Sequence, residues 1–314
     1  MSAPKFIKKL AILVAIEATV GTIVVPISTD AIRVSDVTLT PIEGDEVDEG
    51  VIRPFFGASE TTMVTLYRKV AFSVGFAGVG TVGDLPGWST LMRACAASVT
   101  NTSAPDPDAG TVFAPVTDGI ESVTIYAVMD KMLYKMAGAR GNAKAQVDAK
   151  QIPKWQFEFT GSFVPVEDVG AMPAVNYAKF RSPLGVNKLN TTLELDGFTA
   201  ACSSFAFDFG NQVVKQDLMN VDTTEITGRT STGSVTFRNT DVATKNWIEM
   251  ARESAKVPLL LRHGQAATNT VSISAQRAQI GKPTFSDQDG IQMITCPLRF
   301  IPSDAGNDEW AIAA

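Results

Sequence analysis

The chain is poor in the residues on which most catalytic and metal sites depend. Its 314 residues include one histidine, His263, and three cysteines without a C-x-x-C pair. Ser–His or Cys–His catalysis would have to use that histidine, and its position at the end of an apolar segment before Gly264 favours a structural role. These residues also cannot form the usual zinc ligand sets. We therefore expect a protein that is not an enzyme and that has no catalytic residue, metal or cofactor.

The cysteines Cys95, Cys202 and Cys296 do not suggest a disulfide framework. Their number is odd, and each lies beside apolar residues. A free cysteine behaves as a small apolar residue, and proteins of reducing compartments keep such thiols unpaired. We expect three buried thiols in a protein made in a reducing compartment.

Clustered positive charge is missing as well. The formal net charge of the chain is -6. A protein that grips nucleic acid needs grouped Lys and Arg side chains that neutralise phosphates. An acidic protein can still handle DNA if its task is not to hold it.

The sequence has no unbroken apolar run of the length that a membrane span needs, which is about 20 residues. Lysines followed by the apolar residues 10–16 resemble the start of a signal peptide, but Glu17 interrupts the run and no cleavage site follows. We expect cytoplasmic synthesis and no membrane partner. Ile16 and Glu17 are expected in an extended N-terminal arm or strand that docks on a neighbouring subunit.

Alternation of apolar and polar residues is frequent and predicts a mainly β protein. Residues 70–76 and 155–160 alternate strictly, and residues 123–136 alternate on both sides of a turn, which indicates a hairpin. Two short segments have helical spacing instead. Apolar residues of 88–95 and of 247–254 each fall on one helical face.

Four segments recur in the same order along the two halves of the chain. The pairs are residues 35–39 with 203–207, 70–72 with 235–237, 88–93 with 247–252, and 163–165 with 300–302. Their common order favours a tandem duplication. The sequence predicts an N-terminal domain (1–165), a linker with few strand signals (166–191) and a C-terminal domain (192–314). Each domain is expected to be a small β-barrel or sandwich with one short helix.

The longest irregular region runs over residues 41–62. Its first part is acidic without a basic residue, and residues 51–56 then add exposed aromatic side chains. This composition favours an interaction arm over a solvated loop. The residues expected to contact another subunit or another ring are Glu43, Asp45, Glu46, Arg53, Phe55 and Phe56.

Three patterns bear a weak likeness to sites for ions or phosphates. The acidic run lacks the order of ligands in a calcium loop, and the glycines of residues 75–83 do not form a phosphate loop. Residues 138–142 are expected to form a tight turn between strands. Paired carboxylates of a glycosidase cannot be placed across a cleft from sequence alone.

Several segments together resemble one protein family. The chain resembles the tail tube proteins, or major tail proteins, of long-tailed phages with non-contractile tails, in the two-domain form of Mu-like phages of pseudomonads. The segments that carry the resemblance are 15–22, 34–45, 51–57, 137–141, 152–157, 210–214, 233–237 and 286–290. The set covers nearly the whole chain, and Val20 departs from the aromatic residue expected there.

The resemblance implies a structural virion protein of the tail, assembled in the cytoplasm of the bacterial host. Its two tail-tube-type domains are expected to form trimeric rings of six domains, which stack through the N-terminal segment and the long loop. The partners implied are further copies of the chain and the tail terminator, distal tail and tape measure proteins. Viral DNA would pass through a negatively charged channel without specific binding, and Asp148 and Glu158 are the residues expected to face it.

Three alternatives stay open. A secretion-type tube protein shares the fold but usually has one domain per chain. A capsid decoration or fibre protein would be another β protein of the virion. A glycoside hydrolase would require two carboxylates held across a cleft.

Overall fold

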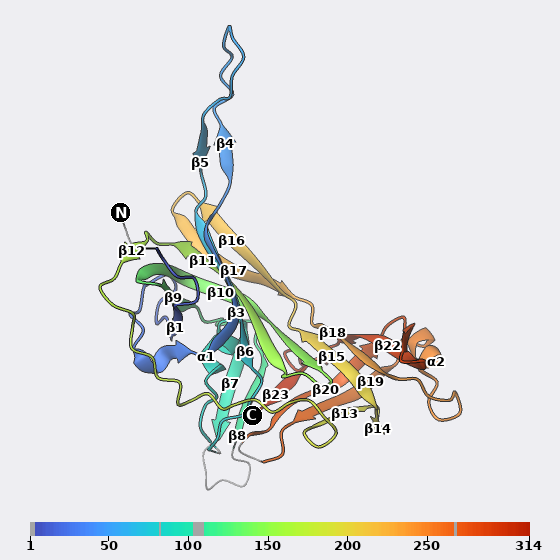
Figure 1. The fold of residues 1–314 in the computed structure, drawn as a ribbon. Coiled ribbons are helices and arrows are strands. Elements are labelled where there is room, and N and C mark those ends of the chain that lie inside the picture. Colours follow the sequence, from blue (N-terminus) through green and yellow to red (C-terminus); the bar gives the residue numbers. More distant parts are fainter. Residues whose placement is uncertain (1–3, 82, 103–109, 267–268) are drawn as a thin grey trace.

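A computed structural model describes residues 4–81, 83–102, 110–266 and 269–314 (Figure 1). The fold is mainly β, as the alternation predicts. The α-helices in the described ranges are α1 (Ser89–Arg93) and α2 (Trp247–Arg252), at the two places where helices are expected. The Asn246 side chain caps α2 by accepting a hydrogen bond from the Glu249 N–H at 3.1 Å.

An antiparallel sheet forms the N-terminal unit, in the order β3, β6, β11, β10, β9, β1, β2. The bounds are β1 Leu10–Ile16, β2 Ala31–Ile32, β3 Val34–Glu43, β6 Tyr67–Gly75, β9 Val123–Met129, β10 Met132–Asp148 and β11 Lys154–Phe163. The expected hairpin is present as β9 and β10. Its turn residues Asp130 and Lys131 both have positive φ, which suits the right-handed twist of the two strands.

The C-terminal unit has an antiparallel sheet in the order β15, β18, β22, β20, β19, β13, β14. The bounds are β13 Thr191–Leu195, β14 Phe198–Thr199, β15 Cys202–Asp208, β18 Thr232–Arg238, β19 Lys256–His263, β20 Val271–Ile280 and β22 Ile291–Phe300. Strand β21 (Thr284–Gln288) pairs with the first half of β22, and β20 pairs with its last residues.

The remaining elements are short or project from these sheets. Two hairpins project, β4 (Glu46–Asp48) with β5 (Thr61–Met63) and β16 (Asn211–Leu218) with β17 (Val221–Arg229). The others are the 3₁₀ turn η1 (Ser28–Asp30) and strands β7 (Ala97–Thr102), β8 (Gly110–Pro115), β12 (Glu167–Asp168) and β23 (Ala311–Ala313).

The two units share one order of strands. In both, a first strand pairs near the sheet end with a two-residue strand, and a projecting hairpin joins the next two paired strands. A short helix follows, then an antiparallel pair, which in the N-terminal unit comes after an additional pair, β7 with β8. The last long strand returns beside the strand that precedes the helix. The equivalences that this order defines are β3 with β15, β6 with β18, β11 with β22, and β10 with β20 and β21 together.

The cross-strand registers agree with two of the matched segments. Val70 lies opposite Phe159 in the N-terminal unit, and Val235 lies opposite Cys296 in the C-terminal unit. Phe159 precedes Phe163, and Cys296 precedes Phe300, by the same number of residues. The match of residues 35–39 with 203–207 is wrong by two residues. It makes Leu39 equivalent to Phe207, but Leu39 lies opposite Val70, and the residue opposite Val235 is Phe205.

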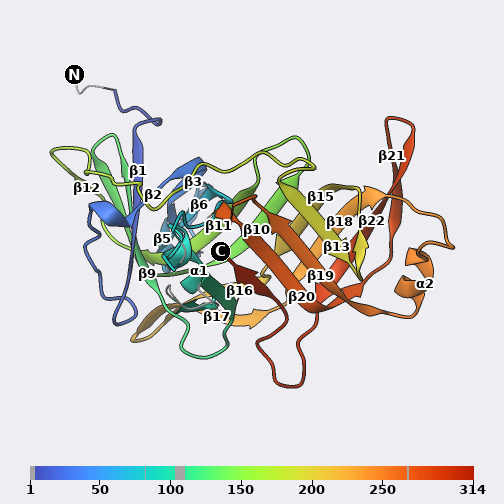
Figure 2. The same ribbon diagram turned by 90° about the horizontal axis from the view of Figure 1, so that it is seen from below.

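The long strand β10 joins the units into one continuous sheet (Figure 2). Its second half pairs with β11 on one edge and with β15 of the C-terminal unit on the other. A second connection comes from the end of the chain, since β23 pairs with both β20 and β8. The two units are therefore not independent bodies joined only by the linker.

The core is aromatic in both units. Phe72 packs between Phe157 and Phe159, with ring centroids about 6 Å apart, and these rings are buried. In the C-terminal unit, Phe209 stacks on Trp310 at 4.3 Å between centroids. Each such ring contributes roughly 1.5–3 kcal/mol by leaving water. Cys95 and Cys296 are buried as expected and Cys202 is half-buried. Burial raises the pKa of the Cys296 thiol to about 12.

Three local expectations were wrong. Ile16 ends β1, which pairs with β9 of the same chain, and Glu17 is buried, so neither residue belongs to a free arm. Residues 138–142 lie inside β10, where a bulge stands in place of the expected turn. Residues 41–62 are not irregular throughout, because part of this stretch forms strands β4 and β5.

Candidate assembly surfaces

Eight strands of the continuous sheet expose one polar face. Their order is β3, β6, β11, β10, β15, β18, β22, β21. Residues directly opposite one another share a face of a sheet. One row of such residues is Thr38, Ala71, Glu158 and Asn142, and the next is Lys144, Asp208, Thr232 and Arg299. The opposite face carries the apolar core.

Charges on the polar face are largely paired. The described ion pairs there are Lys144–Asp208 at 3.0 Å, Lys69–Glu43 at 3.1 Å and Lys154–Asp36 at 2.6 Å. The hydrogen bond from Lys154 lowers the pKa of the Asp36 carboxyl. In the two rows named above, the pairing leaves Arg299 as the cation that has no ion-pair partner among the described residues.

The two acids expected in the channel both lie on adjacent strands of this face. Glu158 on β11 is exposed and has no ion-pair partner among the residues that the structure describes. Asp148 on β10 is half-buried and accepts hydrogen bonds from the Gln146 side chain at 2.9 and 3.0 Å.

The polar sheet ends in two edges that have no strand partner within the described parts of the chain. One is the outer edge of β3, whose other edge pairs with β6. The other is the outer edge of β21, whose five residues are all exposed. An open edge presents unpaired N–H and C=O groups and is a template for pairing with another chain.

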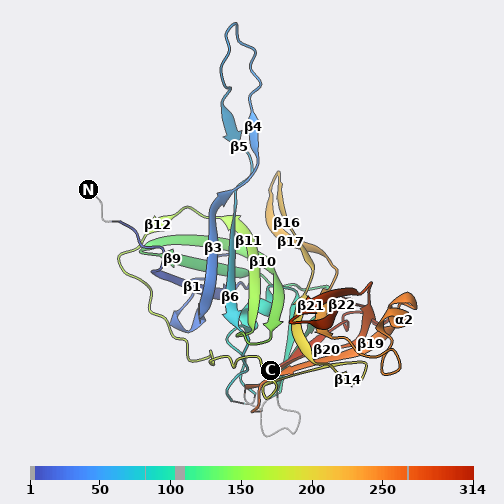
Figure 3. The same cartoon turned by 45° about the vertical axis from the view of Figure 1, so that its right-hand side comes forward.

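The β4–β5 hairpin projects far from the body and carries most of the expected contact residues (Figure 3). Glu43 ends β3 and bonds to Lys69, Asp45 accepts a hydrogen bond from the Thr65 hydroxyl at 3.2 Å, and Glu46 is exposed on β4. Arg53, Phe55 and Phe56 follow at the exposed tip. Phe56 is fully exposed, which is rare for an aromatic residue without a partner surface.

The β16–β17 hairpin, in contrast, lies against the N-terminal unit. Buried Arg140 of β10 donates to the Thr224 carbonyl at 2.8 Å and pairs with Glu225. Lys215 donates to the Ser162 hydroxyl at 2.8 Å. Its burial lowers the pKa of the Lys215 ammonium. The hairpin therefore packs on β10 and β11 through its polar groups.

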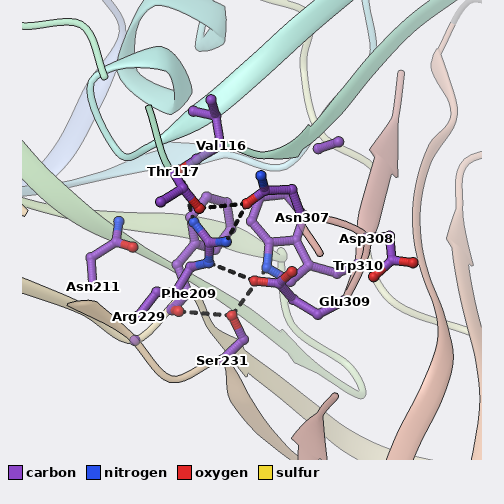
Figure 4. A network of polar contacts seen from close by, with 12 residues as sticks. Val116, Thr117, Phe209, Asn211, Arg229, Ser231, Asn307, Asp308, Glu309 and Trp310 are labelled. Atoms are coloured by element: carbon purple, nitrogen blue, oxygen red, sulfur yellow. Dashed lines mark hydrogen bonds and ion pairs between the residues drawn. The ribbon is translucent and has the colours of Figure 1, made fainter. Parts of the chain in front are cut away.

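A buried ion pair fixes the base of this hairpin (Figure 4). Arg229, at the end of β17, binds Glu309 at 2.6 Å and donates to the Val116 carbonyl at 3.0 Å. The Trp310 indole N–H donates to the Ser231 hydroxyl at 3.1 Å. Residues from the hairpin, the N-terminal unit and the end of the chain thus meet in one network, which sequence reasoning missed because its members are far apart in the chain.

The polar groups that could suggest chemistry have structural partners. Glu17 accepts hydrogen bonds from Ser122, Thr124 and the N–H groups of Gly21 and Gly138, at 2.6–2.9 Å. His263 is buried, its Nδ1 lies 2.8 Å from the Thr191 hydroxyl, and burial lowers the pKa of the imidazole.

The described residues lack the groupings that a metal site or a glycosidase site needs. No group of three His, Cys, Asp or Glu residues there has the arrangement of a metal site. A cavity of about 690 Å³ in the C-terminal unit has Asp289 as the single carboxylate in its lining, whereas a glycosidase needs two.

None of the helices in the described ranges has the length and apolar character of a membrane span. Neither the known protein-family models nor the curated proteins show a match to this chain.

Proposed function

We propose that the protein is the structural subunit of a phage tail tube, which forms rings that stack around a channel for DNA. One observation supports the proposal above all. An eight-stranded sheet with a polar face ends in two open edge strands, and within the chain two strands equivalent to these edge strands already pair with each other. This internal junction is the pairing of β10 with β15. The protein acts in this proposal as a scaffold of the virion tail and not as an enzyme.

The internal junction supplies a template for contact between copies. In the shared strand order, β3 is equivalent to β15, and β21 is equivalent to the second half of β10. Gln146 lies opposite Ala206 in the internal ladder. The equivalent residues are Gln288 and Thr40, so β21 of one copy pairs with β3 of the next through these two residues. Such a head-to-tail contact forms a closed ring when its rotation closes.

The shared strand order also supports a tandem duplication. A junction between units would then repeat within and between chains, and three chains would give a ring of six similar units. This number follows from the resemblance to two-domain tail tube proteins and from the presence of two equivalent units in each chain.

The polar face of the sheet would line the channel. Lys144, Lys69 and Lys154 on this face are paired with acids and Glu158 is negative, so only a few free cations, Arg299 among them, remain on its described residues. Attraction of DNA depends on such cations through counterion release, so this lining would let DNA pass without retention. The remaining partners of the proposal are the tail terminator, distal tail and tape measure proteins.

Disulfide cross-linking combined with electron microscopy tests the ring. The variant Thr40→Cys with Gln288→Cys should give covalent trimers on oxidation and six-lobed rings or tubes in class averages. The control pairs Thr40→Cys with Thr284→Cys, which lies at the other end of β21 and should cross-link poorly. The native thiols give little background because burial suppresses their thiolate form. Compact monomers under all assembly conditions would contradict the proposal and favour a decoration or fibre protein.

A further inference from the structure

The two projecting hairpins have equivalent bases. A Cβ atom added to Gly44 would lie 1.8 Å from the Thr65 carbonyl oxygen, and one added to Gly210 would lie 1.9 Å from the Thr230 carbonyl oxygen. Each hairpin begins at a glycine, because the backbone of a threonine from the returning arm lies so close that a side chain would not fit. This shared contact aligns the hairpins independently of their side chains.

The pairs of residues beyond the bases can then be matched, with Thr227 of β17 left over at a bulge that β5 does not have. Glu46–Met63, Val47–Thr62 and Asp48–Thr61 follow in β4–β5, and the Glu49 N–H donates to the Glu60 carbonyl at 3.2 Å. In β16–β17, the corresponding pairs are Gln212–Gly228, Val213–Ile226, Val214–Glu225 and Lys215–Thr224. Glu49 is thus equivalent to Lys215, and Glu60 is equivalent to Thr224.

Lys215 and Thr224 are among the residues that contact the N-terminal unit. Thr224 is completely buried, and its carbonyl accepts the hydrogen bond from Arg140. The Lys215 side chain is 7% exposed and donates to Ser162. Glu49 and Glu60, at the same places of a hairpin that projects away from the body, are both exposed (Figure 3).

The surface equivalent to the one under β16–β17 lies on the C-terminal unit and is basic. Ser162 directly precedes Phe163, as Arg299 directly precedes Phe300. Arg140 lies opposite Thr160, and the equivalent contact is the hydrogen bond from the Gly281 N–H to the Pro297 carbonyl at 2.8 Å, next to Lys282. Lys282 and Arg299 are exposed and have no ion-pair partner in the described residues.

We propose that the β4–β5 hairpin of one copy lies across the C-terminal unit of the next copy in the same ring, with Glu49 and Glu60 against Lys282 and Arg299. This inference rests on the proposed ring. It accounts for the position of Glu49 opposite Glu60 on the two arms of the hairpin. Like charges opposite each other destabilise an isolated hairpin, and two cations from a neighbouring copy would neutralise them. The hairpin then gains these contacts only when the ring assembles, and the tip residues Phe55 and Phe56 remain free to contact the next ring.

Charge reversal with rescue tests the contact in the full chain. Glu49→Lys with Glu60→Lys should raise the protein concentration needed for ring formation about tenfold at low salt, because attraction is replaced by repulsion. Lys282→Glu with Arg299→Glu should do the same. All four changes in one chain should restore assembly, since every copy carries both surfaces. The matched control is Lys256→Glu with Arg262→Glu, two exposed residues of β19 that should leave assembly unchanged.

Light scattering and circular dichroism separate the outcomes. Rings that form equally well in all variants would overturn this inference and leave the proposed tube intact. Assembly that is lost in both double variants and not restored by the fourfold variant would also overturn it, provided that each variant is folded. A wild-type chain that never forms rings would overturn the proposed function and this inference together.

Discussion

The two projecting hairpins start from equivalent places and differ in what they contact. The β16–β17 hairpin lies on the N-terminal unit through Arg140, Ser162 and Lys215, whereas β4–β5 extends into solvent with Phe56 exposed. The difference lies in connectivity, because the unit under the first hairpin belongs to the same chain. The equivalent surface for the second hairpin would belong to another copy. The contacts of the first hairpin therefore indicate what the second one lacks in an isolated subunit.

The largest expected effect is on the docked hairpin. Replacing residues 213–227 by Asn-Gly keeps a two-residue turn between the paired Gln212 and Gly228 but removes the Thr224 and Glu225 partners of Arg140, which keeps only its hydrogen bond to the Ile120 carbonyl. Loss of a partner from a buried charge costs about 3–5 kcal/mol. Urea denaturation should show a decrease of that size in the free energy of unfolding. A decrease of less than about 1 kcal/mol in the free energy of unfolding would mean that β16–β17 contributes as little to stability as β4–β5.

A single residue should show a smaller part of this effect. Arg140→Ala removes hydrogen bonds to the Thr224 and Ile120 carbonyls and the pair with Glu225. We expect a loss of about 2 kcal/mol in the same measurement. Arg252→Ala is the control, because Arg252 pairs with Glu249 on an exposed helix face and its removal should not change stability measurably. Equal losses in the two variants would argue against a specific role for Arg140.

The seam between the units should respond to acid. His263 contacts Phe76 of the N-terminal unit, and burial lowers the pKa of its imidazole in the folded state. Below an unfolded pKa of about 6.5 the unfolded chain takes up the proton first, so stability is fully present above that pH and falls below it. The slope from one proton is at most about 1.4 kcal/mol per pH unit. His263→Gln should reduce the slope between pH 6.5 and 5, and an unchanged slope would exclude His263 as its source.

The smallest effect on stability is expected for the free hairpin. Replacing residues 47–62 by Asn-Gly removes no described contact with the body and should change the free energy of unfolding by less than about 0.5 kcal/mol. Tubes should nevertheless fail to form, as judged by electron microscopy. The cut begins after Glu43, because Glu43 still pairs with Tyr67 in the sheet. Tubes of normal length from this variant would contradict a role in stacking.

The sequence predicts the features that local patterns determine. Strict alternation identified β6 and β11, the turn at Asp130–Lys131 separated β9 from β10, and spaced apolar residues located both helices. Residues 138–142 were misassigned because a bulge inside a strand and a turn between strands use the same glycines. The burial of Glu17 does not follow from local pattern, because three of its four donors, Ser122, Thr124 and Gly138, come from distant segments.

Sequence patterns also identify only some residues of the candidate surfaces, because the others depend on contacts between distant segments. Composition located the acidic hairpin, and alternation placed Glu158 on an exposed face. The contacts of Arg140, the open edge of β21 and the Arg229 network depend on pairings between residues far apart in the chain. Lys282 and Arg299 become notable only after the cross-strand registers of both units are known.

The strand β10 makes the covalent link between the units redundant. Its pairing with β15, together with the pairing of β23 with β8, holds the halves side by side without help from residues 166–191. A protease that cuts this largely exposed segment would therefore yield two fragments that stay bound under native conditions and part only in denaturant. Damage at this point of the chain would leave its shape, and any assembly built from it, in place.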